Sequence, residues 1–185
     1  MDVGIKHLAV TSEGVYYENP KVLKRYERKL KRLQRQLSRR QKRGRNWHKT
    51  QAKLAKLHYR ITCIRQDAQH KATTAIVNGA SRIGIESLNV AGMLKNHRLA
   101  KALSDASLSS FLSMLTYKAE RIGVKIVEAD AFYPSSKTCS ACSTVDSDLS
   151  LSDRTYHCSV CGHIQDRDLN AAINLRNVAM GHTET

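Results

Sequence analysis

Four of the five cysteines in this chain fall in one C-terminal window. They are spaced C-x2-C-x15-C-x2-C, at Cys139, Cys142, Cys158 and Cys161. Each C-x2-C pair can offer two thiolates from one tight turn, and four thiolates complete the tetrahedral shell that Zn²⁺ prefers. Because four thiolates leave no open coordination position, we predict a structural zinc ribbon and not a catalytic zinc site.

Three acidic positions are candidates for a catalytic metal site, which the four cysteines cannot form. Asp2 opens the stretch "DVGIKHLAV", Glu86 ends the run "RIGIE", and Asp166 or Asp168 opens the run "LNAAINL". Each has an ordinary explanation as a solvated terminus, a strand-end carboxylate or a helix cap. If the first strand and the Glu86 strand share one sheet and the last helix packs across it, the three carboxylates converge.

A converging cluster of this kind suits two Mg²⁺ ions, which take carboxylate oxygens and support phosphodiester hydrolysis. Asp166 and Asp168 are two residues apart, so on a helix they point to different sides and only one of them can face the site. The residue pattern does not choose between them.

Positive charge is concentrated in one segment. The 185 residues carry a formal net charge of +15, with 31 Lys and Arg against 16 Asp and Glu, and the pI is about 9.9. Residues 21–60 hold 17 of these cations and a single acid, Glu27. A balance this basic indicates a polyanionic partner, usually nucleic acid.

The basic segment has helical periodicity on both sides of the break "RGRN" at 43–46. Apolar residues recur every three or four positions, first from Leu23 to Leu37 and then from Trp47 to Ala68. The pattern predicts a helical hairpin, at about 21–78, with two apolar seams packed together and cations outside. A solvated charged surface is the alternative, but like charges one turn apart destabilise a helix unless a ligand neutralises them. We therefore predict nucleic-acid contacts there and on a later helix, by Arg28, Arg32, Arg35, Arg39, Lys42, Arg43, Lys49, Lys53 and Lys118.

The remaining segments predict an α/β plan built on a single sheet with mixed strand directions. Short strands are expected at 3–5, 7–12, 14–18, 81–88 and 124–130, with helices across roughly 99–122 and 168–178. The expected organisation is a core at 1–133 that includes the hairpin, a ribbon at 134–165, and a final helix and tail at 166–185. We find no apolar run long enough to span a membrane and no leader peptide, so we expect a cytoplasmic, nucleoid-associated protein of a prokaryote.

Several stretches carry a family resemblance. "DVGIKHLAV", "NPKVLKRYERKLKRLQRQLSRRQK", "RQDAQHKAT", "GIESLNVAGM", "SSKTCSAC" and "CSVCGHIQDRDLNAAINL" resemble, in order, the C-terminal half of TnpB (OrfB) proteins. These proteins are encoded by insertion-sequence transposons and are related to the type V CRISPR effector nucleases. The resemblance implies a RuvC-like, RNase H-type core with an inserted zinc ribbon, and a metal-binding triad of Asp2, Glu86 and Asp168. It also implies DNA cleavage guided by an RNA made from the transposon end.

One departure bears on function. Family members usually carry a large N-terminal recognition region before the first acid, whereas this sequence starts one residue before Asp2. We therefore expect an N-terminally truncated, Mg²⁺-dependent DNA endonuclease of the RuvC type. Two alternatives stay open: a catalytically silent DNA- or RNA-binding remnant or regulator, and one half of a split nuclease.

Overall fold

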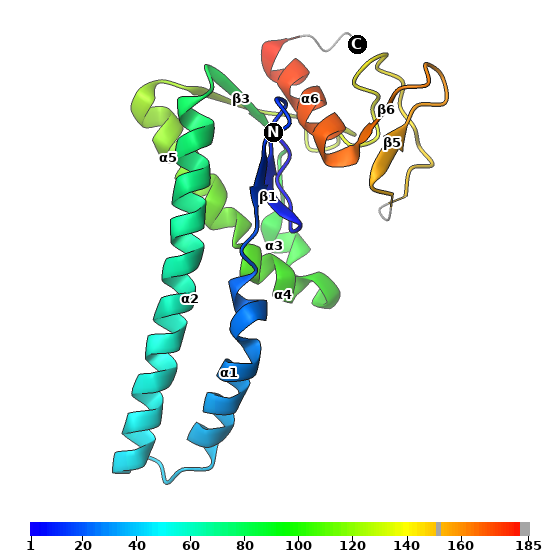
Figure 1. The fold of residues 1–185 in the computed structure, drawn as a ribbon. Coiled ribbons are helices and arrows are strands. Elements are labelled where there is room, and N and C mark those ends of the chain that lie inside the picture. The colour runs from blue at the N-terminus through cyan, green and yellow to red at the C-terminus, as the bar shows by residue number, and fades with distance from the viewer. Residues whose placement is uncertain (151–152, 182–185) are drawn as a thin grey trace.

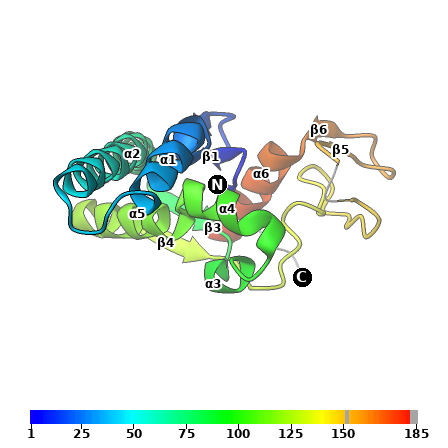
Figure 2. The ribbon, with the colours of Figure 1, turned by 90° about the horizontal axis from the view of Figure 1, so that it is seen from below.

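The computed structural model describes residues 1–150 and 153–181. The small parts of the predicted ribbon and tail at 151–152 and 182–185 lie outside these residues. The described residues form both helices and strands, and the basic hairpin and the ribbon lie at opposite ends of the molecule (Figures 1 and 2). In order, the elements are β1 (His7–Val10), β2 (Tyr16–Glu18), α1 (Val22–Ser38), α2 (Arg45–Asn78), β3 (Arg82–Ile85), α3 (Val90–Met93), α4 (His97–Ala106), α5 (Leu108–Ile122), β4 (Lys125–Glu128), β5 (Thr155–His157), β6 (Ile164–Asp166) and α6 (Arg167–Met180).

The predicted helical hairpin is confirmed. Helices α1 and α2 run side by side and project from the rest of the molecule (Figure 1). Their seam buries Val22, Leu30 and Leu33 of α1 against Leu57 and Ile61 of α2. Two short apolar stripes explain the packing, because the remaining positions of both helices are polar and stay in water.

The strands form three two-stranded sheets in the described part of the chain, and not the single mixed sheet that we expected. β1 pairs antiparallel with β2, β3 pairs parallel with β4, and β5 pairs antiparallel with β6. Residues 3–5 form no strand, since the chain bends after Gly4 and Asp2 makes only an isolated bridge to Val10. The amino group of Met1 nonetheless donates a 2.7 Å hydrogen bond to Gly84 O, which ties the first residues to β3.

The predicted helix at 99–122 is two helices, α4 and α5. The break falls at Ser107, whose φ of 53° lies in the left-handed region. The buried side chain of Gln69, on α2, donates to the carbonyl oxygens of Ala106 and Ser107 at 2.9 and 3.1 Å. These bonds satisfy carbonyls at the end of α4 that a continuous helix would satisfy internally.

Helix α6 lies directly against β3. A side chain at Gly84 would place its Cβ 2.1 Å from the carbonyl oxygen of Leu175, so only glycine allows this approach. Ala179 also lies beside Gly84, so the C-terminal half of α6 packs on β3. The main core fills the space between these elements and α2 and α5, with Phe111, Leu115 and Leu8 fully buried.

Candidate metal centres and nucleic-acid surface

The four cysteines converge at one point in the ribbon. Their sulfur atoms all lie within 4.8 Å of one another, with 3.7 Å between Cys139 and Cys161 and 3.6 Å between Cys142 and Cys158. Zn–S bonds of about 2.3 Å in a tetrahedron require sulfurs roughly 3.8 Å apart, so the observed spacing fits that ion. The cluster can therefore hold a metal ion.

Local backbone geometry brings the sulfurs together. The residue after the second cysteine of each pair is left-handed, with φ of 62° at Ser143 and 72° at Gly162. Serine adopts this conformation at a greater steric cost than glycine. The Thr144 hydroxyl, 3.3 Å from the sulfur of Cys142, lowers the pKa of that thiol to about 6, which favours the thiolate that a metal binds.

The three candidate carboxylates come from distant parts of the chain and are each half-buried. Asp2 is held by two backbone hydrogen bonds to Val10, of 2.9 and 2.8 Å. Glu86 follows β3 directly, and Asp168 lies in the first turn of α6. Burial, followed by the charges of Glu86 and Asp168, raises the pKa of Asp2 to about 7. The three groups are thus close enough to repel one another.

The structure separates Asp166 from Asp168. The Asp166 carboxylate accepts hydrogen bonds from the backbone N–H groups of Asp168 and Leu169, at 3.0 and 3.1 Å, and so caps α6. Asp168 and Asp2 line a cleft of about 420 Å³. Lys21 and Arg154 also line this cleft, and neither was a predicted site residue. No pattern in the sequence around Lys21 or Arg154 identifies either of them as a site residue.

The third carboxylate, Glu86, does not line that cleft. One of its oxygens accepts a hydrogen bond from the hydroxyl of Ser135, which is buried. Among the described residues, the four cysteines form a compact group of metal-ligating atoms and the three carboxylates do not.

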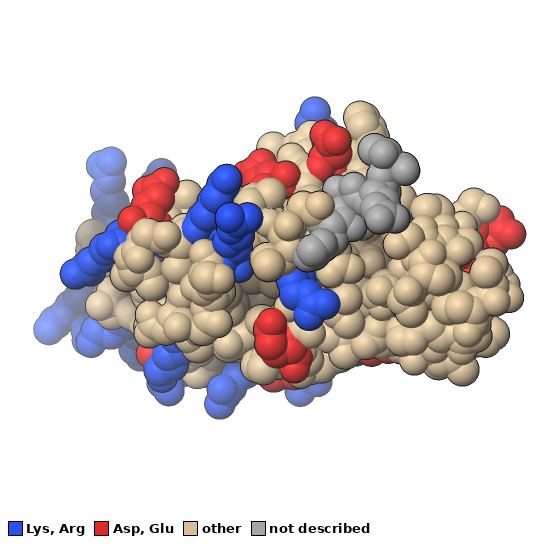
Figure 3. Space-filling view, turned by 90° about the horizontal axis from the view of Figure 1, so that it is seen from above, with Lys and Arg blue, Asp and Glu red and all other residues tan. Residues whose placement is uncertain are grey.

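Exposed cations cover the hairpin. Lys and Arg side chains project from the hairpin end of the molecule in Figure 3. The single acid of residues 21–60, Glu27, pairs with Lys31 and Lys101 at 2.7 Å each. Eight of the nine predicted nucleic-acid contacts are exposed, namely Arg28, Arg32, Arg35, Arg39, Lys42, Arg43, Lys49 and Lys53.

The ninth, Lys118, faces inward. Its ammonium group donates to the carbonyl oxygen of His70 and to the hydroxyls of Thr73 and Thr74, at 2.8, 2.7 and 2.8 Å. All three donors of the ammonium group are thus used to join α5 to α2. Burial lowers the pKa of Lys118.

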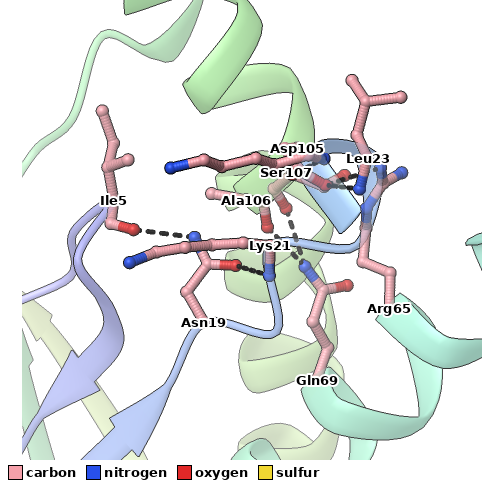
Figure 4. Close-up of polar contacts among 10 residues, drawn as sticks. Ile5, Asn19, Lys21, Leu23, Arg65, Gln69, Asp105, Ala106 and Ser107 are labelled. Carbon is pink, nitrogen blue, oxygen red and sulfur yellow. Dashed lines mark hydrogen bonds and ion pairs between the residues drawn. The ribbon is translucent and has the colours of Figure 1, made fainter. Parts of the chain in front are cut away.

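The base of the hairpin is fixed by a polar junction (Figure 4). Asp105, at the end of α4, accepts hydrogen bonds from the backbone N–H groups of Leu23 and Lys24 and pairs with Arg65 of α2 at 3.4 Å. It therefore caps α1 in place of a residue from α1 itself. Asn19 accepts from the N–H of Lys21 and donates to Ile5 O, so the chain entering α1 is also anchored.

None of the helices in the described part of the chain combines the length and the apolar character that crossing a membrane requires.

Comparison with known proteins finds similarity to a transposase family and to proteins named as endonucleases. Residues 1–97 match the family model OrfB_IS605, described as "Probable transposase", and residues 109–175 match "Cas12f1-like, TNB domain". A "Putative RNA-guided DNA endonuclease" of Streptomyces pristinaespiralis is 41% identical over 95% of this chain and 43% of its own length. The "Putative RNA-guided DNA endonuclease InsQ" of Escherichia coli K12 is 32% identical over 98% of this chain and 48% of its own.

Structural comparison agrees with the sequence matches. The fold is similar to a chain in the "Cryo-EM structure of the Cas12f1-sgRNA-target DNA complex", with a TM-score of 0.63 and 18% identity over 95% of this chain and 48% of that chain. The chain spans less than half the length of these relatives. Since the OrfB_IS605 match covers more than half of its residues, the chain belongs to the OrfB_IS605 family of probable transposases, the TnpB family.

Proposed function

We propose that this chain is the nuclease half of an RNA-guided DNA endonuclease, with a RuvC-like, RNase H-type core. The core comprises residues 1–133 with the hairpin at about 21–78, the zinc ribbon is 134–165, and the final helix and tail follow at 166–185. The names of the relatives support this activity. Their greater length supports a role for a further recognition region, on the same chain or on a separate one.

Asp2, Glu86 and Asp168 are the proposed ligands of two Mg²⁺ ions. The observation that carries this assignment is that Asp2 and Asp168 line one cleft, while burial and then the charges of Glu86 and Asp168 raise the pKa of Asp2. A hard divalent cation would offset the repulsion between Asp2 and the two other acids. When bound, Mg²⁺ supplies activation of the attacking water and stabilisation of the leaving oxygen.

The protein's own residues supply binding and orientation. Lys6, Lys21 and Arg154 line the same cleft as Asp2 and Asp168, so a phosphate entering it meets three cations. We propose that the exposed hairpin cations bind the nucleic-acid backbone and that a guide RNA reads the DNA sequence by base pairing. A DNA substrate of this kind is consistent with the expected cytoplasmic, nucleoid-associated location.

We propose Zn²⁺ as the ion of the four cysteines, where it would hold the ribbon folded. The sulfur spacing supports this assignment, and the four thiolates leave no position for a substrate.

The test is a cleavage assay on single-stranded DNA with Mg²⁺, with and without a transposon-end RNA. Asp168→Asn should abolish cleavage and leave DNA binding intact, whereas Asp166→Asn should retain cleavage because asparagine also caps helices well. The two substitutions are the same chemical change two residues apart. Equal loss of cleavage in both variants would contradict the assignment of Asp168.

Salt-sensitive binding without cleavage by the unaltered protein would favour the silent DNA- or RNA-binding remnant. Cleavage only after addition of a separate recognition chain would favour the split nuclease. Measurement at two salt concentrations is needed because phosphate contacts weaken as salt rises.

A further inference from the structure

We infer that Ser135 is a positioning residue for Glu86 and that the cysteine ribbon and α6 together hold it in place. This inference rests on the proposed function, since it concerns how one proposed Mg²⁺ ligand is oriented. It assigns the ribbon a second role, because the segment that carries Ser135 ends in a cysteine of the ribbon.

The contact joins a buried hydroxyl to a half-buried carboxylate. Ser135 is 2% exposed, and its hydroxyl donates a hydrogen bond to Oε1 of Glu86. Glu86 lies just past the end of β3, so it is not part of the strand. A donor on one oxygen restricts the rotation of the carboxylate and leaves the other oxygen available to a cation.

The backbone of Ser135 is fixed by α6. The side-chain amide of Asn174 donates to the carbonyl oxygens of Ser135 and Thr138, at 2.8 and 2.7 Å. One turn earlier, Asn170 donates to Thr138 O at 2.7 Å and accepts from the N–H of Ser140 at 2.9 Å. Both asparagines are buried, with exposed fractions of 0% for Asn170 and 3% for Asn174. The helix that carries Asp168 therefore also positions the partner of Glu86.

The ribbon fixes the other end of the same segment. The N–H groups of Lys137 and Thr138 both donate to Pro134 O, at 2.9 and 3.0 Å, so residues 134–138 form a compact turn. Cys139 follows directly, and its N–H donates to Thr144 O at 2.8 Å within the ribbon. A metal ion that holds Cys139, four residues after Ser135, thus restrains the end of this turn.

A purely structural role for Ser135 would be to satisfy a buried polar group without any effect on metal binding. The neighbouring Ser136 provides a matched control, because its hydroxyl accepts from Arg167 at 3.2 Å in place of contacting Glu86. The two serines are adjacent and the substitution is the same. They differ in whether the carboxylate loses its donor.

The experiment measures Mn²⁺ binding, as a probe for Mg²⁺, by isothermal titration calorimetry and by electron paramagnetic resonance on zinc-loaded protein. We expect Ser135→Ala to weaken Mn²⁺ binding about tenfold or more, Ser136→Ala to leave it unchanged, and Ser135→Thr to retain it. Zinc content and melting temperature of each variant show that the ribbon is intact. DNA binding at fixed salt should be equal in all of them.

A second measurement keeps the inference testable if Ser135→Ala does not fold. Cys142→Ser removes an exposed thiolate far from Glu86 in sequence, and the loss of zinc in this variant should also weaken Mn²⁺ binding. Mn²⁺ binding that is lost in Glu86→Gln but unchanged in Ser135→Ala and in zinc-free Cys142→Ser would overturn this inference alone. The absence of any Mn²⁺ binding that depends on Glu86 would overturn the proposed function as well.

Discussion

The hairpin and the carboxylate region of this molecule are stabilised by different kinds of contact. The hairpin is joined by an apolar seam between two helices that are neighbours in the sequence, with Leu30 and Leu33 packed against Leu57 and Ile61. The carboxylate region joins residues that are distant in the sequence, 83 positions apart through the amino group of Met1 and 39 positions apart through the buried Asn174 of α6. Apolar packing tolerates substitution by similar residues, whereas a buried hydrogen-bond network loses stability when one member is removed.

The same contrast holds for charge. The hairpin presents positively charged side chains to solvent, where salt screens their mutual repulsion. The three carboxylates are half-buried and raise the pKa of Asp2, so a cation is needed to offset their repulsion. In the proposed function, the hairpin would therefore bind an extended polyanion and the carboxylate region a divalent metal.

The largest effect is expected in the ribbon, which depends on a bound ion more than on packing. Cys158→Ser should cost most of the ribbon's folding free energy, on the order of 10 kcal/mol for a structural zinc site. Zinc content and hydrogen exchange of β5 and β6 provide the measurement. Cys63→Ser, the same change at a cysteine outside the ribbon, is the control. Unchanged zinc content and stability in Cys158→Ser would show that the ribbon assignment is wrong.

The seam of the hairpin should respond next. Leu57 is 5% exposed, so Leu57→Ala should lower the free energy of unfolding by about 3 kcal/mol through lost packing and a cavity. Tyr59→Ala is the control, because the Tyr59 side chain is exposed. Chemical denaturation followed by circular dichroism measures both variants. If Leu57→Ala also weakened Mn²⁺ binding as strongly as Ser135→Ala, the two regions would not be independent.

The pH dependence of stability tests the carboxylate region. In metal-free protein the folded state retains a proton on Asp2 up to about pH 7, whereas an unfolded aspartate loses it near pH 4. The contribution of Asp2 to stability should therefore be fully present below about pH 4 and be lost as pH rises to about 7, by about 4 kcal/mol. Asp2→Asn should remove this component, and Mg²⁺ should reduce it. A metal-free stability profile that is identical in the two proteins would contradict the burial of Asp2 among other acids.

The smallest expected effect distinguishes the exposed cations of the hairpin from Lys118, which bonds to α2. Arg32→Gln should reduce the slope of log affinity for DNA against log salt concentration by about 0.7–0.9, the value for one phosphate contact. Lys118→Gln should leave the slope unchanged and lower the melting temperature, since its ammonium group bonds to α2. Fluorescence anisotropy over a series of salt concentrations distinguishes them. The reverse result would place the nucleic acid on α5 and not on the hairpin.

The sequence predicted those features that depend on residues close together in the chain. Periodic leucines predicted both hairpin helices, and the cysteine spacing predicted the cluster in the ribbon. The break at Ser107 was not predictable, because its stabilising partner is Gln69 on a different helix. The separate sheets also escaped prediction, since they depend on the bend after Gly4 and on the close packing of α6 against Gly84.

For the site, residue types were more informative than positions. The acids Asp2, Glu86 and Asp168 were singled out from the sequence, but Lys21, Arg154 and Ser135 owe their positions beside these acids to tertiary structure. One local signal was available: two asparagines four residues apart, in the otherwise apolar run of α6, indicate a buried polar contact. Lys118 shows the converse, since a lysine on a polar helix face can bond inward.

The length of α2 sets the scale of any nucleic acid that the hairpin can follow. Its 34 residues extend about 51 Å at 1.5 Å per residue. One strand of B-form DNA places a phosphate every 3.4 Å, so a strand lying along the whole helix would present about 15 phosphates, roughly one and a half turns of duplex. Removing seven residues from each hairpin helix would shorten this footprint by about three phosphates and leave the carboxylate region unchanged.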